Sequence, residues 1–427
     1  MKVLVVGGGG REHALAWGLA RSPQVDEVVA APGNAGIAGI ARIEPVAADD
    51  LEGQVALAAR ERPDLVLVGP EAPLVAGLAD RLRADGHRVF GPSGAAARIE
   101  GSKAFAKEVM ARRGVPTARA GAFDDAGKAV AFLDELGGIG VVKADGLAAG
   151  KGVTVATDRV SAVTAIERCL AGAFGEAGRT VLVEEMLDGP EVSVFGVTDG
   201  NGNCVLLDAA SDHKRIGDGD TGPNTGGMGA YSPVPGLDRA TATHVLDTVI
   251  APVVDELRPY VGVLFVGLML TAEGPKVLEF NCRFGDPETQ ALIPRMPHDL
   301  FALFEACARG WLPDATGHAG FDDGAAVTVV LASGGYPGSY DTGIPIDGLP
   351  EAAATPGTSV FHAGTERRGD TVVTAGGRVL AVTGAGATIE RAREVAYRAA
   401  GHITFDGMTY RRDIAAEAAG LAGEERR

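Results

Sequence analysis

The sequence predicts an α/β protein that begins with a parallel sheet. Short β-branched runs alternate with helical stretches through the first hundred residues, which is typical of a parallel α/β sheet. After Gly320 the pattern becomes richer in strands. A length of 427 residues and a hydrophobic content of 46% fit about three domains with cores of their own. We therefore expect several domains of mixed α/β structure.

The charge and the cysteines exclude several classes of function. The chain carries 39 basic and 56 acidic residues, a net charge of −17 that repels nucleic-acid phosphates. Its four cysteines show no CxxC spacing, which indicates reduced thiols. No apolar run is long enough to span a bilayer, and the N-terminal one is too short for a signal peptide. We expect a cytoplasmic protein without nucleic-acid or membrane partners.

The predicted strands of the first domain end in glycine-containing loops. Ligands bind at the carboxyl ends of strands in parallel sheets, so these loops are candidate binding elements. The expected strands cover 2–6, 25–31, 65–68 and 89–90, with a helix over 11–20. The loops are Gly7 to Gly10, Pro32-Gly33-Asn34 and Gly69-Pro70-Glu71.

The first loop resembles a dinucleotide-binding fingerprint but lacks its last glycine. Glu12 or His13 stands where G-x-G-x-x-G needs glycine, so a nicotinamide cofactor is poorly supported. Two interpretations stay open, a tight turn or an anion site at the helix N-terminus, and we favour the anion site. For His13 we favour a capping or anion-contacting role over catalysis.

A lysine lies within a glycine-rich hairpin predicted between strands 141–143 and 153–156. Gly150-Lys151-Gly152 is not a P-loop, because Gly152 stands where serine or threonine is required. Glycines allow a phosphate to approach the backbone, so the hairpin is either a lid over a triphosphate or a flexible surface turn. Lys143 on the preceding strand points to the same region, and Lys103 opens a helix predicted over 104–112.

Further along, a loop is expected from 211 to 235, long enough to suggest function. Strands are predicted over 181–186 and 191–197, a helix over 240–257, and an antiparallel pair over 263–270 and 276–280. In the C-terminal part we expect strands over 326–331, 371–374 and 377–383 and a helix over 388–399.

The strand that ends near residue 280 carries the most informative side chains. Alternation places Glu279, Asn281 and Arg283 on one face, opposite an apolar face. Carboxylate and amide oxygens suit Mg²⁺, and a guanidinium suits phosphate or carboxylate. A solvated edge strand is an equally good interpretation of the same residues. Neither G-x-S-x-G nor H-E-x-x-H occurs, so a covalent enzyme nucleophile is unsupported.

Taken in order, the motifs resemble the glycinamide ribonucleotide synthetase family of the ATP-grasp superfamily. The resemblance runs nearly end to end, although the family often has a polar residue where Gly8 stands. The most specific strings are 221–229 and 279–288, and the glycine hairpin alone indicates only an ATP-grasp-like enzyme. Further matches are the segments 9–14, 31–36, 68–74, 101–105, 143–152, 212–215, 334–338, 361–365 and 412–414.

The resemblance implies a role for each matching residue. Metal ligands for Mg²⁺ or Mn²⁺ would be Glu279 and Asn281. ATP would meet Lys103, Lys143, Gly150, Lys151, Gly152, Glu184, Glu185, Met186, Leu187, Glu191 and Lys214. Phosphoribosylamine and glycine would meet Gly9, Gly10, Asn34, Gly69, Pro70, Glu71, Thr225, Gly226, Gly227 and Met228. The catalytic set would be Arg283, Lys151, Asp212 and Asn224.

The family also implies a fold and a reaction. We expect an N-terminal substrate-binding domain (1–101), a central α+β ATP-grasp domain (102–322) with a small mobile lid (about 120–187), and a strand-rich domain (323–427), in a monomer. The implied reaction joins glycine to 5-phosphoribosylamine through glycyl phosphate, with ATP consumed, in purine biosynthesis. Another ATP-grasp carboxylate–amine ligase and a nucleotide-sensing module are the alternatives.

Overall fold

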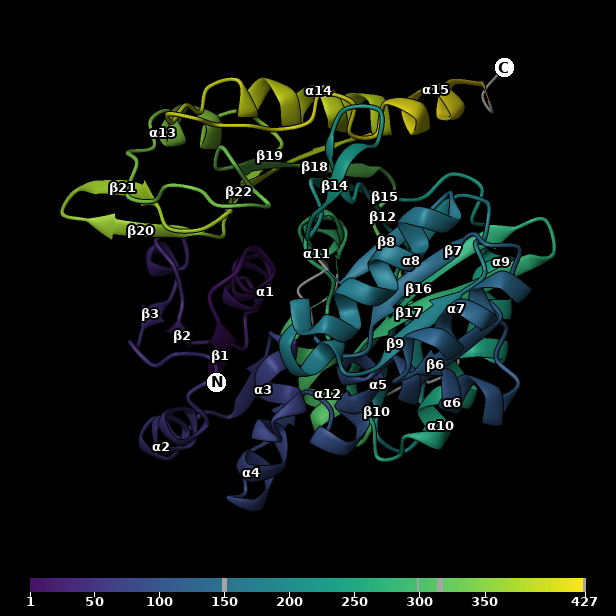
Figure 1. Ribbon diagram of the computed structural model, residues 1–427. Coiled ribbons are helices and arrows are strands. Elements are labelled where there is room, and N and C mark those ends of the chain that lie inside the picture. Colours follow the sequence, from purple (N-terminus) through teal and green to yellow (C-terminus); the bar gives the residue numbers. More distant parts are fainter. Residues whose placement is uncertain (148–151, 298, 313–317, 425–427) are drawn as a thin grey trace.

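The computed structural model describes residues 1–147, 152–297, 299–312 and 318–424. Three regions follow one another along the chain, and Figure 1 shows the N-terminal sheet and the C-terminal layer stacked beside the large central part. The expected architecture is confirmed: an N-terminal parallel sheet, a central antiparallel region and a strand-rich C-terminal region. Among the described residues, no helix is long and apolar enough to cross a bilayer.

The N-terminal sheet is parallel in the order β3-β2-β1-β4-β5, as the alternating pattern predicted. Neighbouring residues of β1 such as Val3 and Leu4 are both fully buried, because helices cover both faces of the sheet. The strands are β1 Lys2–Gly7, β2 Glu27–Pro32, β3 Arg42–Ile43, β4 Leu65–Val68 and β5 Val89–Phe90. The helices are α1 Gly10–Ala20, α2 Leu51–Glu61, α3 Glu71–Val75 and α4 Leu78–Ala84.

The central sheet is antiparallel in the order β11-β10-β16-β17 and ends at the edge strand that carries Glu279. A register shift near Gly267 leaves Leu278 unpaired, so Val277 and Phe280 both reach the core although they are three residues apart. The strands are β10 Glu191–Asp199, β11 Cys204–Leu206, β16 Val261–Thr271 and β17 Gly274–Asn281. The helices are α6 Lys103–Arg113, α9 Arg239–Val245, α10 Ala251–Glu256, α11 Glu288–Leu292 and α12 Leu300–Ala308. Helix α5 Gly94–Gly101 precedes them and belongs to the N-terminal region, where it packs on α3.

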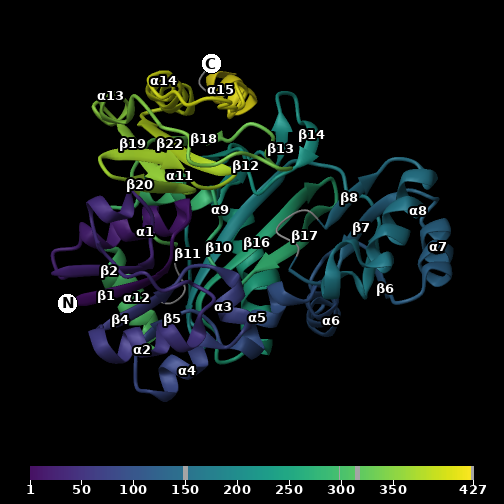
Figure 2. The same ribbon diagram turned by 60° about the vertical axis from the view of Figure 1, so that its left-hand side comes forward.

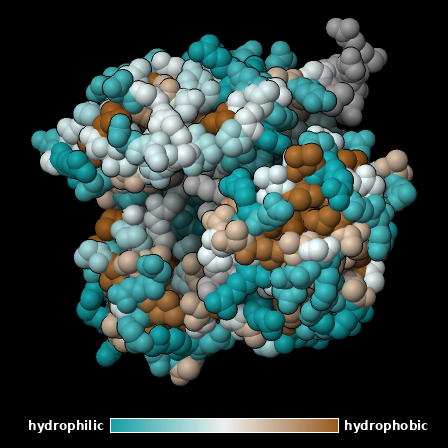
Figure 3. Space-filling model, in the orientation of Figure 1, coloured by the Kyte–Doolittle hydropathy of each residue, from teal (hydrophilic) through white to brown (hydrophobic). Residues whose placement is uncertain are grey.

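A smaller sheet, β6-β9-β7-β8, lies to one side of the central sheet with α7 and α8, as Figure 2 shows. Its strands are β6 Ala120–Phe123, β7 Gly140–Ala144, β8 Val153–Ala156 and β9 Val181–Glu184, and its helices are α7 Ala126–Glu135 and α8 Arg159–Arg168. Hydrophobic side chains gather on the surface around α8 (Figure 3), where Val160 is 77% exposed. The space-filling view is hollowed between the C-terminal layer and the parts below it.

The loop expected over 211–235 contains four short strands, so its description as structureless was wrong. They are β12 Ser211–Asp212, β13 Arg215–Gly217, β14 Thr221–Asn224 and β15 Gly229–Ser232. Two of them extend the C-terminal sheet, whose order is β12-β15-β18-β22-β19, and the other two form a hairpin. The Gly, Asp and Asn content predicted a loop, but the backbone N–H and C=O groups of a partly buried segment need partners, and strand pairing supplies them.

The C-terminal sheet is covered by α14, which begins after the N-cap Thr388. Its buried residues, Ile389, Ala392, Val395 and Ala399 among them, recur at helical spacing and face the sheet. The strands are β18 Ala325–Ala332, β19 Thr358–His362, β20 Thr365–Arg368, β21 Thr371–Thr374 and β22 Arg378–Gly386. The helices are α13 Leu349–Ala353, α14 Ile389–Ala400 and α15 Ala416–Glu424, of which only α14 was predicted.

Aromatic rings join the N-terminal sheet to the central region. Phe90, at the end of β5, stacks on Phe304 of α12 with ring centroids 4.1 Å apart. Phe284, which follows β17, lies within 6.3 Å of Phe90 and 5.7 Å of Phe304. These contacts bury β5 against the segment that carries the site residues, so the packing of the two regions fixes the geometry of the site.

We predict that Phe304→Ala lowers the free energy of unfolding by about 3–5 kcal/mol, because it leaves a cavity among the three rings. Thermal and urea unfolding measure the change. Val160→Ala, at an exposed position of α8, is the control and should cost less than about 0.5 kcal/mol. A cost below about 1 kcal/mol for Phe304→Ala would contradict the proposed packing.

Candidate functional site

The end of β17 brings a carboxylate into a ring of cationic side chains. Glu279 keeps 32% of its side chain exposed and lies 3.7 Å from the Nζ of Lys214. Burial acts to raise the pKa of Glu279, but three lysine ammonium groups outweigh it and hold the pKa below its usual value. They belong to Lys214, Lys143 and Lys103. Glu279 is therefore an ionised carboxylate that remains within reach of solvent.

Each of the three lysines has a partner within the protein. Lys103 donates from Nζ to the carbonyl of Gly146 (3.1 Å), and Lys143 donates to the carbonyl of Leu278 (3.0 Å). Lys214 is paired with Glu191 of β10. Burial is the largest influence on Lys103 and lowers its pKa. These lysines approach from three elements and form a cationic surface around Glu279 that suits an anion such as phosphate.

Asn281, two residues after Glu279, uses its amide nitrogen within the protein. Asn281 Nδ2 donates to Glu100 Oε1 over 2.9 Å, and the backbone N–H of Cys282 donates to Glu100 Oε2 over 2.8 Å. The amide oxygen is thus the atom available to a metal ion. Burial raises the pKa of Glu100, whereas the Arg283 guanidinium acts in the opposite direction.

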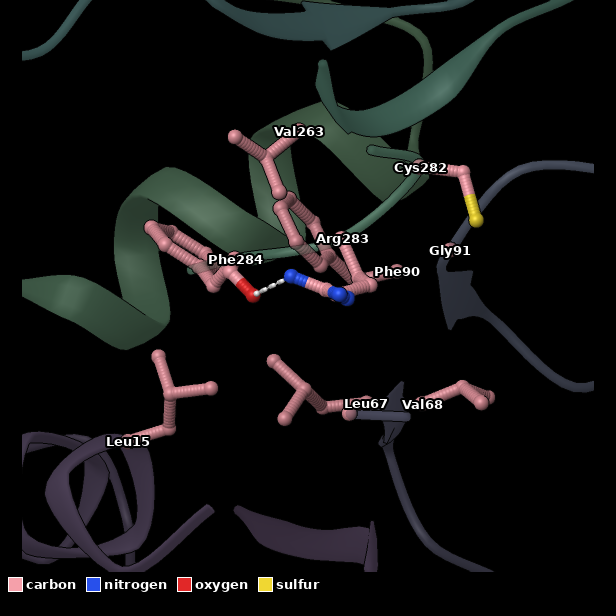
Figure 4. Close-up of a pocket in the computed structure, with 10 residues that line it drawn as sticks. Leu15, Leu67, Val68, Phe90, Gly91, Val263, Cys282, Arg283 and Phe284 are labelled. Atoms are coloured by element: carbon pink, nitrogen blue, oxygen red, sulfur yellow. Dashed lines mark hydrogen bonds between the residues drawn. The ribbon is translucent and has the colours of Figure 1, made fainter. Parts of the chain in front are cut away.

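Arg283 lies between two carboxylates of the N-terminal region. Its Nε is 3.1 Å from Glu71 Oε2, and its Nη2 is 2.8 Å from Glu100 Oε1. It also donates to the carbonyl of Phe284 over 3.2 Å, the bond drawn in Figure 4. The cavity in that figure is about 10 Å³, enough for roughly one water and too small for a substrate. Asn281 and Arg283 both reach Glu100, as their alternation predicted.

The predicted nucleotide-binding residues lie along one border of the site. Glu184 ends β9, earlier than the predicted strand end, and is 2% exposed between Lys143 (3.0 Å) and Lys107 (3.4 Å). Glu185, Met186 and Leu187 are half-buried in the connection to β10, and Glu185 accepts the N–H of Arg119. Glu191 begins β10.

An open cavity of about 390 Å³ lies next to Gly146, whose carbonyl accepts from Lys103, and is in the size range of small-molecule sites. Gly101, Asp145, Gly146, Leu147, Ala177 and Thr180 line it. Asp145 accepts hydrogen bonds from Ser102 Oγ (3.1 Å) and the N–H of Ala104 (2.7 Å), which ties this region to the start of α6. Of the hairpin, Gly152 accepts from Ala144 over 2.8 Å, while Gly150 and Lys151 fall outside the described residues.

The segment after β12 reaches the same site. Asp212 is half-buried, and burial raises its pKa against the opposing effect of Lys214. Asn224 ends β14, opposite Arg215. Thr225 Oγ1 donates to the carbonyl of Lys214 (2.9 Å) and accepts the N–H of Gly227 (3.0 Å). Arg378 donates to the carbonyl of Gly226 and Met228 is fully buried, so the loop is fixed on both sides.

The first glycine loop is occupied by a carboxylate of its own helix. Glu12 is 2% exposed, accepts the N–H of Gly9 over 2.7 Å and pairs with Arg11 over 2.5 Å. A Cβ on Gly7 or Gly69 would lie within 2.5 Å of Glu12, which explains glycine at both positions. An anion at this loop would therefore depend on N–H groups other than that of Gly9. Gly10 begins α1, and Pro70 precedes Glu71 at the start of α3.

Two further predicted residues serve contacts between regions. The amide of Asn34 donates to the carbonyls of Gly8 (2.9 Å) and His362 (2.7 Å) and accepts from the N–H of Gly36 (2.9 Å). His13 accepts the N–H of His362 at Nδ1 over 2.7 Å, and burial lowers the pKa of His13 to about 3. A neutral ring that accepts a backbone N–H has a structural role. The sequence had favoured a capping or anion-contacting role for His13, and the ring makes neither contact in the structure.

The arrangement fits a divalent cation next to an anionic ligand. Glu279 supplies an ionised carboxylate and Asn281 an amide oxygen from the same strand, which are hard ligands suited to Mg²⁺ or Mn²⁺. Within the described residues no cluster of three or more His, Cys, Asp or Glu side chains offers a metal site. A two-residue site that leaves further positions to ligand oxygens is what a metal–phosphate complex needs.

Two residues of the site were missed in the sequence. Lys107 lies one helical turn after Lys103 on α6, so its i,i+4 spacing was a usable signal. Glu100 lies 181 positions from Asn281, and nothing in its local sequence indicates the contact.

Models of one protein family match almost the whole chain. The N domain of phosphoribosylglycinamide synthetase matches residues 1–100, its ATP-grasp (A) domain matches 101–289, and its C domain matches 326–417. Curated relatives from Streptomyces coelicolor and Rhizobium meliloti, both named phosphoribosylamine–glycine ligase, are 54% and 50% identical. The alignments cover 98% of this chain and 100% of the Streptomyces protein, and 97% and 98% for the Rhizobium protein.

Solved structures agree with this match. The phosphoribosylamine–glycine ligase of Thermotoga maritima is 33% identical with a TM-score of 0.82, over 97% of this chain and all of that one. A biotin carboxylase from Campylobacter jejuni, solved as a β,γ-ATP complex, has a TM-score of 0.73 over 96% of this chain and 92% of its own. At 15% identity that likeness concerns the fold alone.

We predict that His13→Asn flattens the acid dependence of stability. The pKa of His13 is about 3 when folded and about 6.5 when unfolded, so its contribution is complete above pH 6.5 and is lost as the pH falls toward 3. Between pH 7 and pH 5 the loss is about 2 kcal/mol. Urea unfolding at the two pH values measures it, and an equal slope in both proteins would contradict the buried neutral state. The asparagine oxygen can still accept the N–H of His362.

Proposed function

The chain belongs to the phosphoribosylglycinamide synthetase family, and from this we propose that it joins glycine to 5-phosphoribosylamine with ATP. The products are glycinamide ribonucleotide, ADP and phosphate, and the reaction belongs to purine biosynthesis. The observation that carries the proposal is the match of relatives named phosphoribosylamine–glycine ligase, which are about half identical over nearly the full length. The cationic site at the end of β17 supports it.

Both nucleophiles come from the substrates. The carboxylate of glycine attacks the γ-phosphorus of ATP, ADP leaves, and glycyl phosphate forms. The amine of phosphoribosylamine then attacks the glycyl carbon, and phosphate leaves with the electron pair of the broken C–O bond. The protein therefore needs to position reactants and stabilise charge rather than supply a covalent group, which accounts for the missing nucleophile motif.

We assign the ATP phosphates to Lys103, Lys143 and Lys214, whose ammonium groups surround Glu279. The adenine would lie against the connection from Glu184 to Leu187, and the carboxylate of Glu191 would accept hydrogen bonds from the ribose hydroxyls. In the described state Lys214 is paired with Glu191. Gly150, Lys151 and Gly152 are proposed to contact the triphosphate, and exclusion of water from the site would protect glycyl phosphate.

Glu279 and Asn281 would hold Mg²⁺ or Mn²⁺ against the phosphates. A bound divalent ion would neutralise phosphate charge and align the γ-phosphate. The adjoining residues Arg283, Asp212 and Asn224 are proposed to stabilise the transferred phosphate and orient glycine. The guanidinium of Arg283 is preorganised for this by its two carboxylate partners.

Phosphoribosylamine and glycine would be held by the surrounding loops. We assign the N-terminal loops with Gly9, Gly10, Asn34, Gly69, Pro70 and Glu71 to phosphoribosylamine, and the loop from Thr225 through Gly226 and Gly227 to Met228 to glycine. Asn34 would act by holding its loop, because its amide is already bonded to four backbone groups. The site is built from one chain, and we propose a cytoplasmic monomer.

The deciding experiment measures phosphate release with ATP, Mg²⁺ and phosphoribosylamine, with glycine compared with alanine and serine. We expect release to require glycine and phosphoribosylamine together, with glycinamide ribonucleotide as the product by mass spectrometry. Another ATP-grasp carboxylate–amine ligase would instead release phosphate with a different amino acid or without phosphoribosylamine. Either result would overturn the proposed substrate pair.

We predict that Glu279→Ala lowers kcat at least 100-fold while the fold persists, because the variant loses an ionised ligand from a partly exposed site. Steady-state kinetics at saturating Mg²⁺ and circular dichroism measure the two effects. The control is Glu273→Ala in the turn before β17, where the carboxylate is 76% exposed and pairs only with Lys276 in the described contacts. Near-native kcat in Glu279→Ala would refute the role.

A further inference from the structure

Glu100 is a buried carboxylate that belongs to the N-terminal region and acts on the central one. It lies in the last turn of α5 and is 7% exposed. Three donors from the end of β17 meet its two oxygens: Asn281 Nδ2 at 2.9 Å, the N–H of Cys282 at 2.8 Å and Arg283 Nη2 at 2.8 Å. These three residues lie two, three and four positions after Glu279.

The contact decides which atom of Asn281 can bind a metal. An ionised carboxylate only accepts hydrogen bonds, so the amide group that faces Glu100 is the NH₂. The amide oxygen is then the free end of the side chain. Without the carboxylate, the amide could rotate by half a turn and present its NH₂ to the cation, which repels it.

We propose that Glu100 is a positioning residue that holds Asn281 in its metal-binding orientation, an inference that rests on the proposed metal site. Glu100 does not touch the metal or the substrates in this role. It also accepts from Arg283, which Glu71 of the N-terminal region holds on the other side. The N-terminal region therefore sets the orientation of two side chains at the end of β17, and the metal site is completed only when the two regions are packed together.

Glu100→Gln tests the proposal with little change of shape. The new amide has one accepting oxygen, so it cannot accept from Asn281 on one side and from the N–H of Cys282 on the other. We expect the Kd of the Mn²⁺–ATP complex to rise 10- to 100-fold, the usual effect of removing a group that orients a metal ligand. Titration calorimetry and the electron paramagnetic resonance of Mn²⁺ measure this Kd without catalytic turnover. The affinity for ATP in EDTA should change less than threefold.

A second substitution separates orientation from general damage. In Asn281→Asp both ends of the side chain are oxygens, so rotation no longer matters. Adding Glu100→Gln to Asn281→Asp should then raise the Kd of Mn²⁺–ATP less than threefold, because the glutamine NH₂ can donate to the new carboxylate. A loss that is equally large in both backgrounds would assign Glu100 a merely structural role and overturn the proposal.

Asp199→Asn is the matched control. Asp199 is also a buried carboxylate (2% exposed) that accepts a backbone N–H, from Leu312 at 3.2 Å, but it lies at the far end of β10 from Glu191. Its substitution should leave the Kd of Mn²⁺–ATP unchanged. Glu100→Asp, which withdraws the carboxylate by one methylene, is measured in case Glu100→Gln does not fold, and an unchanged Kd there would overturn the proposal.

The variant Glu279→Ala distinguishes a failure of the positioning role of Glu100 from a failure of the metal site on which that role depends. Loss of Mn²⁺–ATP binding in Glu279→Ala with full binding in Glu100→Gln would leave the metal site in place and overturn the positioning role alone. Full binding in Glu279→Ala would remove the metal site itself, and the positioning role with it.

Discussion

The ion pairs between the N-terminal region and the end of β17 are the contacts on which the rest of the site depends. Arg283, which follows β17, is bound by Glu71 and Glu100 of the N-terminal region. Buried charges are costly unless they are paired, so each of these groups is stable only in the presence of its partner. The N-terminal sheet cannot separate from β17 without leaving Arg283 unpaired. Aromatic packing around Phe304 adds a shape constraint to this electrostatic one.

Charge balance also connects the parts of the candidate site that come from distant segments. Glu279, Glu191 and Asp212 lie on three strands, and Lys214 lies in the connection from β12 to β13. Each of the four shifts the pKa of at least one other. A triphosphate carries several negative charges. The lysines would attract these charges, whereas the acidic residues of the site would repel them. Under the proposed function, a cation that arrives with the nucleotide would compensate the charge of Glu279.

The sequence predicted the parts of the fold whose signal is local. β1, β4 and the β16–β17 pair follow from β-branched runs, and α14 follows from helical spacing after Thr388. β15 could not be predicted, because it pairs with β18, a segment about 100 residues away, and β12 in turn pairs with β15. The β13–β14 hairpin is local, but its Gly, Asp and Asn content predicted a loop. The site divides in the same way. Alternation on β17 predicted Glu279 and Asn281, whereas Glu100 became visible only through a contact across 181 positions.

Glu12 shows why a missing motif can be informative. The first loop has Glu12 where the dinucleotide fingerprint requires glycine, and the sequence alone shows only that the motif is incomplete. In the structure its carboxylate fills the space between Gly7 and Gly69 and accepts the N–H of Gly9. One N–H group of the loop is therefore already bonded to a carboxylate of the helix that follows it. Arg11 pairs with this carboxylate and also donates to the carbonyl of Phe284 over 3.0 Å. Glu12, which removes the dinucleotide fingerprint, is thus the partner of Arg11, the residue that joins the first helix to the segment after β17.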